Sequence, residues 1–234
     1  MKYKYLEKID STNSYCKENI DSLHDKTIVY TSNQTNGRGR FDRVWIDLGT
    51  ENIYMSLVLK PSKELLPVYS NLTQYTALKL AQTFEKYKLT PQIKWPNDIL
   101  INDKKISGIL AETVIKNNEL KGLVIGIGIN LNANENDFLK IDKEVTSLNL
   151  EIKKEVDKQE FLKSFSKTFF EDYETFLENG FFYIKKEYEK RVNFIGKEIT
   201  IQNINQTITG IVDGISNSGA IIIDNQEYLT GDIL

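Results

Sequence analysis

The sequence has little of what several classes of protein need. Cys16 is its only cysteine and His24 its only histidine. It therefore has neither a disulfide framework nor the Cys-rich or His-rich spacing of many metal sites. We expect both residues to be structural or exposed, and the protein to work in a reducing cytoplasm.

Long apolar runs and an excess of positive charge are also missing. The N-terminal MKYKYLEKID has no apolar signal core, and no run approaches the ~20 apolar residues of a membrane span. The sequence has 30 Lys and Arg residues and 33 Asp and Glu residues, which gives a net charge of -3. No global positive field therefore exists to attract nucleic acid. The 234 residues, 40% of them hydrophobic, predict one sizeable folded domain with a small second one.

The residue pattern predicts an α+β protein with a mixed β-sheet flanked by helices. Strands are expected at 3–9, 27–32 and 52–60, with three or four more in 91–132 joined by turns at 102–104 and 116–119. Helices are expected after a cap among residues 10–13, over 68–87, and twice within 157–191, where Gly180 separates them and an aromatic stripe faces the core. The pattern favours a loop between Pro61 and Pro67 and mostly irregular structure over 134–154.

The composition changes near Asn193. From Gly196 onward, short β-branched runs alternate with Asn, Gly and Asp turns. This is typical of a small β-barrel of about 40 residues. We therefore predict two domains, 1–190 and 191–234.

The stretch from Thr31 to Trp45, TSNQTNGRGRFDRVW, combines glycines with Arg38, Arg40 and Arg43. Glycine lets a chain bend closely around a ligand, and guanidinium groups suit carboxylate and phosphate oxygens. The pattern favours a mobile anion-binding loop that closes over a small charged substrate. Taken alone, it fits equally a solvated surface loop or a basic tract that contacts RNA.

Several polar residues interrupt the apolar segment 91–132. They are Lys94, Asn97, Asp98, Lys105, Glu112 and Asn130. Because a charge in a β-rich core is costly unless it is paired or bound, together they indicate a site on the sheet surface. Two simpler interpretations stay open, namely an ion pair between Lys94 and Asp98 and a solvated hairpin lysine at 105. The cap among residues 10–13 would add backbone N–H groups and hydroxyls suited to a polar ligand.

Three motifs follow one another along the chain. They are GRGRxxRxW at 37–45, KWPND at 94–98 followed by KxxGIL at 105–110, and GIGIN at 126–130. With the β-rich C-terminal segment after them, the sequence resembles the biotin protein ligases along essentially its whole length. The resemblance implies a class II synthetase-like catalytic domain with a small C-terminal SH3-like β-barrel. It also implies that biotin and MgATP form biotinyl-5'-adenylate, which a lysine of a biotin carboxyl carrier domain then attacks.

The resemblance also implies roles for individual residues. The biotin-binding residues would be Ser11, Thr12, Asn13, Gln34, Gly37, Arg38, Gly39, Arg40, Lys105 and Gly108. The ATP-binding residues would be Arg43, Trp45, Lys94, Asn97 and Asn130, with Asp98 assisting Mg²⁺. Lys105 and Arg40 would be catalytic through their charge. Gly126 and Gly128 would let the ligand lie close to the backbone.

Two departures from the family pattern bear on these expectations. Asp42 stands where many members have glycine, which adds a negative charge beside an expected phosphate site. The catalytic pattern also starts directly at Tyr3, which leaves no room for the helix-turn-helix domain of many bacterial members, so DNA binding is not expected.

The carrier domain of acetyl-CoA carboxylase or pyruvate carboxylase is the expected partner, and both a monomer and a homodimer are compatible with the sequence. A lipoate or octanoyl protein ligase shares the acyl-adenylate chemistry, but its Ser-Gly-Gly-Gly-type loop is absent here. A non-catalytic module that binds a small ligand or phosphate is the other alternative.

Overall fold

The computed structural model describes residues 1–49, 51–60, 66–203 and 206–234, without the side chains of Asp42, Leu66, Pro67 and Lys140. Its internal contacts group the chain into two compact units. The first unit comprises Met1–Glu64 and Asp103–Leu162, and the second comprises Leu65–Asn102 and Lys163–Leu234. The predicted division at 190/191 is based on the change in composition, not on internal contacts, and it stays a prediction.

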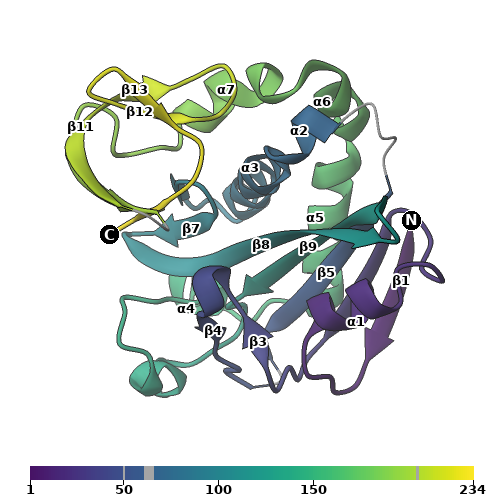
Figure 1. Ribbon diagram of the computed structural model, residues 1–234. Coiled ribbons are helices and arrows are strands. Elements are labelled where there is room, and N and C mark those ends of the chain that lie inside the picture. The colour runs from purple at the N-terminus through teal and green to yellow at the C-terminus, as the bar shows by residue number, and fades with distance from the viewer. Residues whose placement is uncertain (50, 61–65, 204–205) are drawn as a thin grey trace. The chain divides into compact units, whose positions relative to one another are not determined.

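The first unit is built on five neighbouring strands in the order β1-β2-β5-β9-β8 (Figure 1). Their bounds are Lys2–Leu6 for β1, Thr27–Thr31 for β2, Ile53–Leu59 for β5, Lys104–Lys116 for β8 and Glu119–Ile129 for β9. Strands β1 and β2 run parallel, and the other pairs are antiparallel. All seven residues of β5 are buried, as its apolar, β-branched sequence predicts for a central strand. The expectation of a mixed sheet is confirmed.

Helix α1, Thr12–Glu18, covers one face of these strands and packs on β2, β5 and β9 (Figure 1). Of the four candidate caps, the structure uses Ser11, whose hydroxyl accepts a hydrogen bond from the Ser14 amide at 3.4 Å. Cys16 is fully buried in the apolar cluster beneath the helix, whereas His24 is exposed. Both fit the structural and exposed roles expected for them.

The β8–β9 hairpin is the longest strand pair of the first unit. Its turn residues Asn117 and Asn118 have φ values of 51° and 61°. A two-residue hairpin turn of type I′ needs positive φ at both positions, and asparagine tolerates this better than most residues. The predicted turn at 116–119 is therefore confirmed, and Asn102 and Asp103 at the other predicted turn also have positive φ.

The arginine-rich stretch forms a small hairpin of β3, Gly37–Arg38, and β4, Val44–Trp45, around the 3₁₀ turn η1, Arg40–Asp42. Glycine is required at 37 because a Cβ there would lie 2.8 Å from the Gln34 Nε2 and collide with the Trp45 carbonyl. The expected loop thus contains a short strand pair that its sequence did not predict. The side chain of Asp42, the residue that departs from the family pattern, lies outside the described part of the chain.

The second unit carries most of the helices. They are α2, Leu66–Tyr69; α3, Leu72–Glu85; α6, Tyr173–Asn179; α7, Phe181–Glu189; and the larger part of α5, Lys158–Phe170. The ring of Tyr75 stacks on Phe176 at a centroid distance of 4.3 Å. Phe165, Phe169 and Phe176 are fully buried, so the aromatic stripe lies in the core as predicted.

The segment 157–191 holds three helices, although the sequence predicted two. Gly180 separates α6 from α7 as expected, with φ 65° and ψ -158°. The additional break precedes Tyr173, where the Asp172 carboxylate accepts hydrogen bonds from Tyr75 at 2.8 Å and Lys79 at 2.8 Å. These partners come from α3, far away in sequence, so the local pattern gives no sign of this break.

The other strands of the second unit form a hairpin of β6, Gln92–Lys94, with β7, Asp98–Ile101, and a C-terminal antiparallel sheet. The sheet has the order β13-β12-β11-β10-β14. Its strands are β10, Glu198–Gln202; β11, Thr207–Ile215; β12, Ile221–Ile223; β13, Gln226–Tyr228; and β14, Asp232–Ile233. The predicted β-rich C-terminal region is confirmed, while its closure into an SH3-like barrel stays a prediction.

Two further expectations need correction. The segment 134–154 was predicted as mostly irregular, yet it contains the 3₁₀ helix η3, Glu135–Lys140, and helix α4, Leu148–Ile152. Pro67 was expected in a loop but lies in the first turn of α2, where proline is tolerated; residues 61–65 lie outside the described residues. No helix in the described ranges is long and apolar enough to cross a membrane.

Candidate functional site

A floor of glycines lies on β8 and β9. Gly108 pairs with Gly128, and Leu110 with Gly126, so the three glycines share one sheet face. A Cβ on Gly108 would lie 2.6 Å from the Trp45 indole, and one on Gly126 would lie 2.8 Å from the Asn13 carboxamide carbon. The indole and the carboxamide therefore rest directly on the backbone. Any residue larger than glycine at these positions would leave no room for them.

A cluster of buried polar residues stands at the start of α1. Ser11, Thr12, Asn13 and Gln34 are all less than 10% exposed. The Gln34 Oε1 accepts hydrogen bonds from the Thr12 amide at 2.9 Å and from the Thr12 hydroxyl at 3.2 Å. The structure thus brings together four residues that the sequence assigned to one ligand.

Ser56 is a member of this cluster that the sequence analysis missed. Its hydroxyl lies 2.8 Å from the Thr12 hydroxyl and donates to the Asn13 Oδ1 at 2.5 Å. Ser56 is fully buried on β5 and pairs with Gly126. A single serine in the apolar run IYMSLVL was the available signal, because buried polar groups need partners.

Asp47 holds the C-terminal end of the arginine-rich stretch in place. Its carboxylate accepts from the Gln34 amide at 3.2 Å and from the Tyr54 hydroxyl at 3.0 Å. The Tyr54 hydroxyl in turn accepts from the Leu48 amide at 2.8 Å. Burial raises the Tyr54 pKa far above its ordinary value, and the nearby Asp47 charge adds to this effect. The phenol therefore stays a neutral donor, and the chain after Trp45 is tied to β5.

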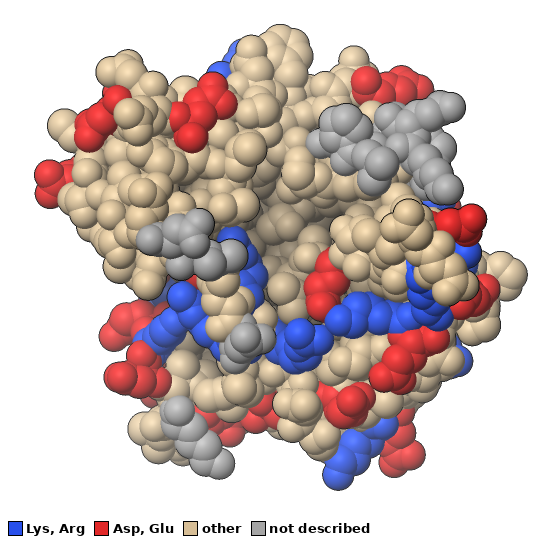
Figure 2. Space-filling view, viewed as in Figure 1, with Lys and Arg blue, Asp and Glu red and all other residues tan. Residues whose placement is uncertain are grey.

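The three arginines occupy the exposed side of the hairpin. The side chain of Arg38 is 43% exposed, and Arg43 is exposed. Arg40 is half-buried, with its guanidinium carbon 5.0 Å from the centroid of the Phe41 ring. Figure 2 shows Lys and Arg side chains in a band across the face that carries β3 and α1, with acidic side chains beside them. The local cationic surface exists although the whole chain is slightly acidic.

Lys105 lies at the opposite end of the glycine floor from the α1 cluster. Its Nζ is 5.4 Å from the centroid of the Trp45 ring, and a Cβ on Gly108 would lie 3.2 Å from that nitrogen. Its backbone is held on both sides, since its amide donates to Glu144 and its carbonyl accepts from Thr146. Lys105 is half-buried, which argues against the alternative of a fully solvated hairpin lysine.

Asn130, expected to bind ATP, has a structural contact in this conformation. The side chain is 4% exposed, and its Nδ2 donates to the Thr146 carbonyl at 3.0 Å. The same residue accepts from the Leu148 amide through its backbone carbonyl. Asn130 therefore helps to hold the segment that also fixes the backbone of Lys105.

Lys94, Asn97 and Asp98 lie in the second unit, on the β6–β7 hairpin. Lys94 and Asp98 are opposite each other in the strand register, and Asn97 Nδ2 donates to the Asp98 carboxylate at 3.1 Å. The described residues contain no group of three or more His, Cys, Asp and Glu side chains that could hold a metal ion. One carboxylate is still compatible with Mg²⁺, which often binds one or two carboxylates together with substrate phosphates.

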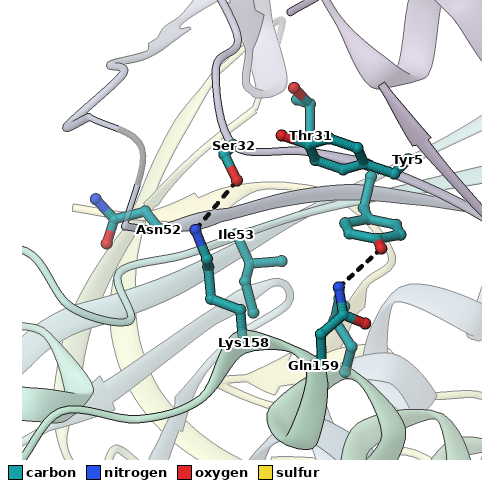
Figure 3. Close-up of a pocket in the computed structure, with 9 residues that line it drawn as sticks. Tyr5, Thr31, Ser32, Asn52, Ile53, Lys158 and Gln159 are labelled. Carbon is teal, nitrogen blue, oxygen red and sulfur yellow. Dashed lines mark hydrogen bonds between the residues drawn. The ribbon is translucent and has the colours of Figure 1, made fainter. Parts of the chain in front are cut away.

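A separate pocket of about 290 Å³ lies elsewhere in the first unit, between β1, β2, β5 and the start of α5 (Figure 3). Lys158 donates to the Ser32 hydroxyl at 3.2 Å across it, and Gln159 donates to the Tyr30 hydroxyl at 2.9 Å. Thr31 and Ser32 at its lining begin the arginine-rich stretch, but none of the lining residues is among those that the resemblance assigned to a ligand. The pocket is therefore distinct from the glycine floor, where the predicted biotin-binding residues of the first unit lie.

Comparisons with known proteins show which family the chain belongs to. Residues 5–130 match the model of the biotin/lipoate A/B protein ligase family, and residues 194–233 match the biotin protein ligase C-terminal domain. The chain is 31% identical to the biotin--[acetyl-CoA-carboxylase] ligase of Paracoccus denitrificans, covering 93% of this chain and 92% of that protein. The chain belongs to the biotin protein ligases.

Other members of this ligase family are similar in sequence or structure. The bifunctional ligase/repressor BirA of Bacillus spizizenii is 33% identical over 95% of this chain and 69% of its own length. The chain spans about two thirds of the length of the bifunctional relatives it matches. The biotin protein ligase of Aquifex aeolicus, solved with biotin and ATP, gives a TM-score of 0.83 at 28% identity and covers 100% of this chain and 97% of that one.

The geometry of this ligase suits a ligand with two different ends. At the α1 end, hydroxyl and amide groups can exchange hydrogen bonds with a neutral polar group. At the other end, the Lys105 ammonium can pair with an anion beside the indole of Trp45. Between these two ends, the Trp45 indole lies on Gly108 and Gly128, and the Asn13 carboxamide lies on Gly126.

Proposed function

We propose that this protein activates biotin with ATP and transfers it to a lysine of a biotin carboxyl carrier domain. The observation that carries the proposal is the arrangement of the first unit, where the buried α1 cluster and Lys105 stand at opposite ends of one glycine floor. Biotin has a neutral ureido ring at one end and a carboxylate at the other. Its two ends match the two ends of the site.

The proposed chemistry has two steps. A carboxylate oxygen of biotin attacks the α-phosphorus of ATP, and pyrophosphate leaves. The amine of a carrier lysine then attacks the acyl carbon of biotinyl-5'-adenylate, and AMP leaves. Both substrates of the first step are anions, so positive charge is needed to offset their repulsion and to stabilise the transition state. We propose Lys105 and Arg40 for this task.

The other residues receive the roles that the family resemblance implies for them. Ser11, Thr12, Asn13 and Gln34 would bond the ureido ring, and the floor at Gly108, Gly126 and Gly128 would contact the rest of biotin. Gly37, Arg38 and Gly39 would close over it. Trp45 would stack on adenine and Asn130 would read it, which requires Asn130 to exchange its contact with Thr146 for one with the base.

The assignments in the second unit rest on the KWPND motif. Lys94 and Asn97 would bind phosphates of ATP, and the same role is proposed for Arg43, which belongs to the first unit. Asp98 would assist Mg²⁺, which offsets charge on those phosphates when bound. We further propose a carrier domain of acetyl-CoA or pyruvate carboxylase as the partner, a cytoplasmic location, and a separate C-terminal domain over 191–234. The single buried cysteine fits a reducing compartment.

Exchange of labelled pyrophosphate into ATP tests the proposed activation step. We expect exchange that depends on biotin and Mg²⁺ and that lipoate does not support. A lipoate or octanoyl ligase would give the opposite preference, and a passive binding module would give no exchange with either acid. Incubation with a carrier domain, followed by mass spectrometry for the biotinyl increase on one lysine, tests the transfer step.

A further inference from the structure

Glu112 is a partly buried carboxylate that the proposed roles leave unused. It lies on β8 opposite Val124 of β9, on the same sheet face as Gly108. Its side chain is 19% exposed. A charge in this position is costly unless it is well paired, so its partners indicate what it does.

Three side chains from two other segments converge on this carboxylate. Lys17 Nζ of α1 lies 2.6 Å from its Oε1, and Asn13 Nδ2 of α1 donates to its Oε2 at 2.8 Å. Arg38 of β3 approaches the Oε1 at 3.7 Å. Partial burial raises the Glu112 pKa, but the hydrogen bonds from Lys17 and Asn13 and the two positive charges outweigh it, so the net pKa lies below its ordinary value. The group is therefore a carboxylate at neutral pH.

The contact with Asn13 fixes which way its carboxamide points. A carboxylate can only accept hydrogen bonds, so it must face the amide NH₂. The Asn13 Nδ2 also donates to the Leu110 carbonyl at 3.2 Å, while its Oδ1 accepts from Ser56 on the other side. With Glu112 and Ser56 at its two ends and Gly126 beneath, the carboxamide presents an oxygen, and not an NH₂, on the Ser56 side of the site.

The contact with Arg38 concerns the arginine-rich hairpin. Arg38 follows Gly37, whose backbone lies next to the Gln34 carboxamide, and the Arg38 side chain is 43% exposed. Glu112 thus forms an ion pair with this guanidinium on the side of the α1 cluster. One carboxylate therefore links the buried half of the site with its exposed half.

We propose that Glu112 is a positioning residue for biotin, which orients the Asn13 carboxamide and holds Arg38 over the site without touching the reacting atoms. This rests on the proposed function. It implies that Glu112 controls the affinity for biotin much more than the rate of adenylate formation or the affinity for ATP.

The test compares Glu112→Gln with Glu119→Gln in biotin-dependent pyrophosphate exchange. Glu119 lies on the same hairpin and pairs with Lys121 at 2.8 Å, but it is 58% exposed. We expect Glu112→Gln to raise the KM for biotin about tenfold or more, the effect of losing one charge-assisted hydrogen bond. The kcat and the KM for ATP should change less than about threefold, and Glu119→Gln should match the wild type within about twofold.

A double-mutant cycle separates positioning from general damage. If Glu112 acts through Asn13, Glu112→Gln should add little to the KM for biotin in the Asn13→Ala background. Full additivity, an unchanged KM for biotin, or an equal rise in both KM values would overturn the proposal. Should Glu112→Gln fail to fold, Glu112→Asp takes its place, because it keeps the charge but withdraws it from Asn13, and the same outcomes decide. Absence of exchange in the wild type would instead reject the proposed function itself.

Discussion

The buried cluster at the start of α1 and the arginine-rich hairpin face the same glycine floor but are built in opposite ways. Ser11, Thr12 and Asn13 are at most 4% exposed, and Thr12 and Asn13 bond to Ser56 of β5 and Glu112 of β8. Phe41 and Val44 in the hairpin are 46% and 70% exposed, and Phe41 has a positive φ of 51°. Such a φ is uncommon for a bulky residue. One half of the site is held by buried hydrogen bonds, and the other is exposed.

This difference suits an enzyme that handles a reactive mixed anhydride. A rigid half can select biotin before any chemistry takes place, because its donors and acceptors already point in fixed directions. An exposed, cationic half can admit ATP and then exclude water from the adenylate. Four predictions test the comparison, from the largest expected effect to the smallest.

The largest effect is expected for Lys105→Ala. Lys105 is the cation beside the indole at the reacting end of the floor, so its loss should reduce biotin-dependent pyrophosphate exchange by at least about 10²-fold. The exposed neighbour Lys104 provides the matched control, and Lys104→Ala should be close to the wild type. Near-normal exchange in Lys105→Ala would remove it from catalysis.

The second prediction concerns Arg40→Gly in the exposed half. The fold should be retained, because Arg40 lies on the rim of the hairpin and not in the core. The adenylate should escape about tenfold faster, since one charged contact of the closing half is lost. Release of labelled biotinyl-5'-adenylate from a preformed complex measures this. An unchanged release rate together with an unchanged melting temperature would show that the hairpin is no lid.

The third prediction concerns stability of the buried half. Thr12→Val keeps the shape of the side chain but removes a hydroxyl that contacts Gln34 and Ser56. Urea unfolding should show a loss of about 1–2 kcal/mol, because two buried polar groups lose a partner. Thr35→Val, at an exposed position, should stay within about 0.5 kcal/mol of the wild type. Equal effects would mean that the cluster is not preorganised by these bonds.

The smallest effect tests the burial of Cys16 on the apolar side of α1. Burial raises the Cys16 pKa from 9.0 to about 12. The native thiol therefore stays protonated while the unfolded thiol ionises, so stability falls as pH rises above 9. The fall should reach up to about 1.4 kcal/mol per pH unit, and Cys16→Ala should lack this part of it. Parallel curves for both proteins, measured by urea unfolding between pH 8 and 9.5, would contradict the burial.

Local patterns were enough to predict most of the elements that carry the site. The buried strand β5 follows from an unbroken apolar run, and α1 follows from a cluster of capping residues, although the sequence offered four caps and only the fold selected Ser11. The resemblance then joined Thr12, Asn13 and Gln34 to one ligand, and the structure brings these three together.

The features that the sequence analysis missed or left without a role depend on contacts between distant segments. Ser56 and Glu112 acquire partners only when β5 and β8 meet α1. The break before Tyr173 depends in the same way on Tyr75 and Lys79. No periodicity in the sequence encodes such pairings, so a lone polar residue in an apolar strand could be noticed but not given a role.

The position of Trp45 has a practical consequence. The chain has two tryptophans. Trp95 is 2% exposed and donates to the Gly219 carbonyl at 3.2 Å within the second unit. Trp45 lies on the glycine floor beside the Lys105 ammonium, and among the described residues its buried Nε1 finds no hydrogen-bond acceptor. The two indoles thus differ in polarity and in access to solutes. Fluorescence emission from Trp45 would therefore change when the floor is occupied, which gives the protein an intrinsic optical reporter that needs no label.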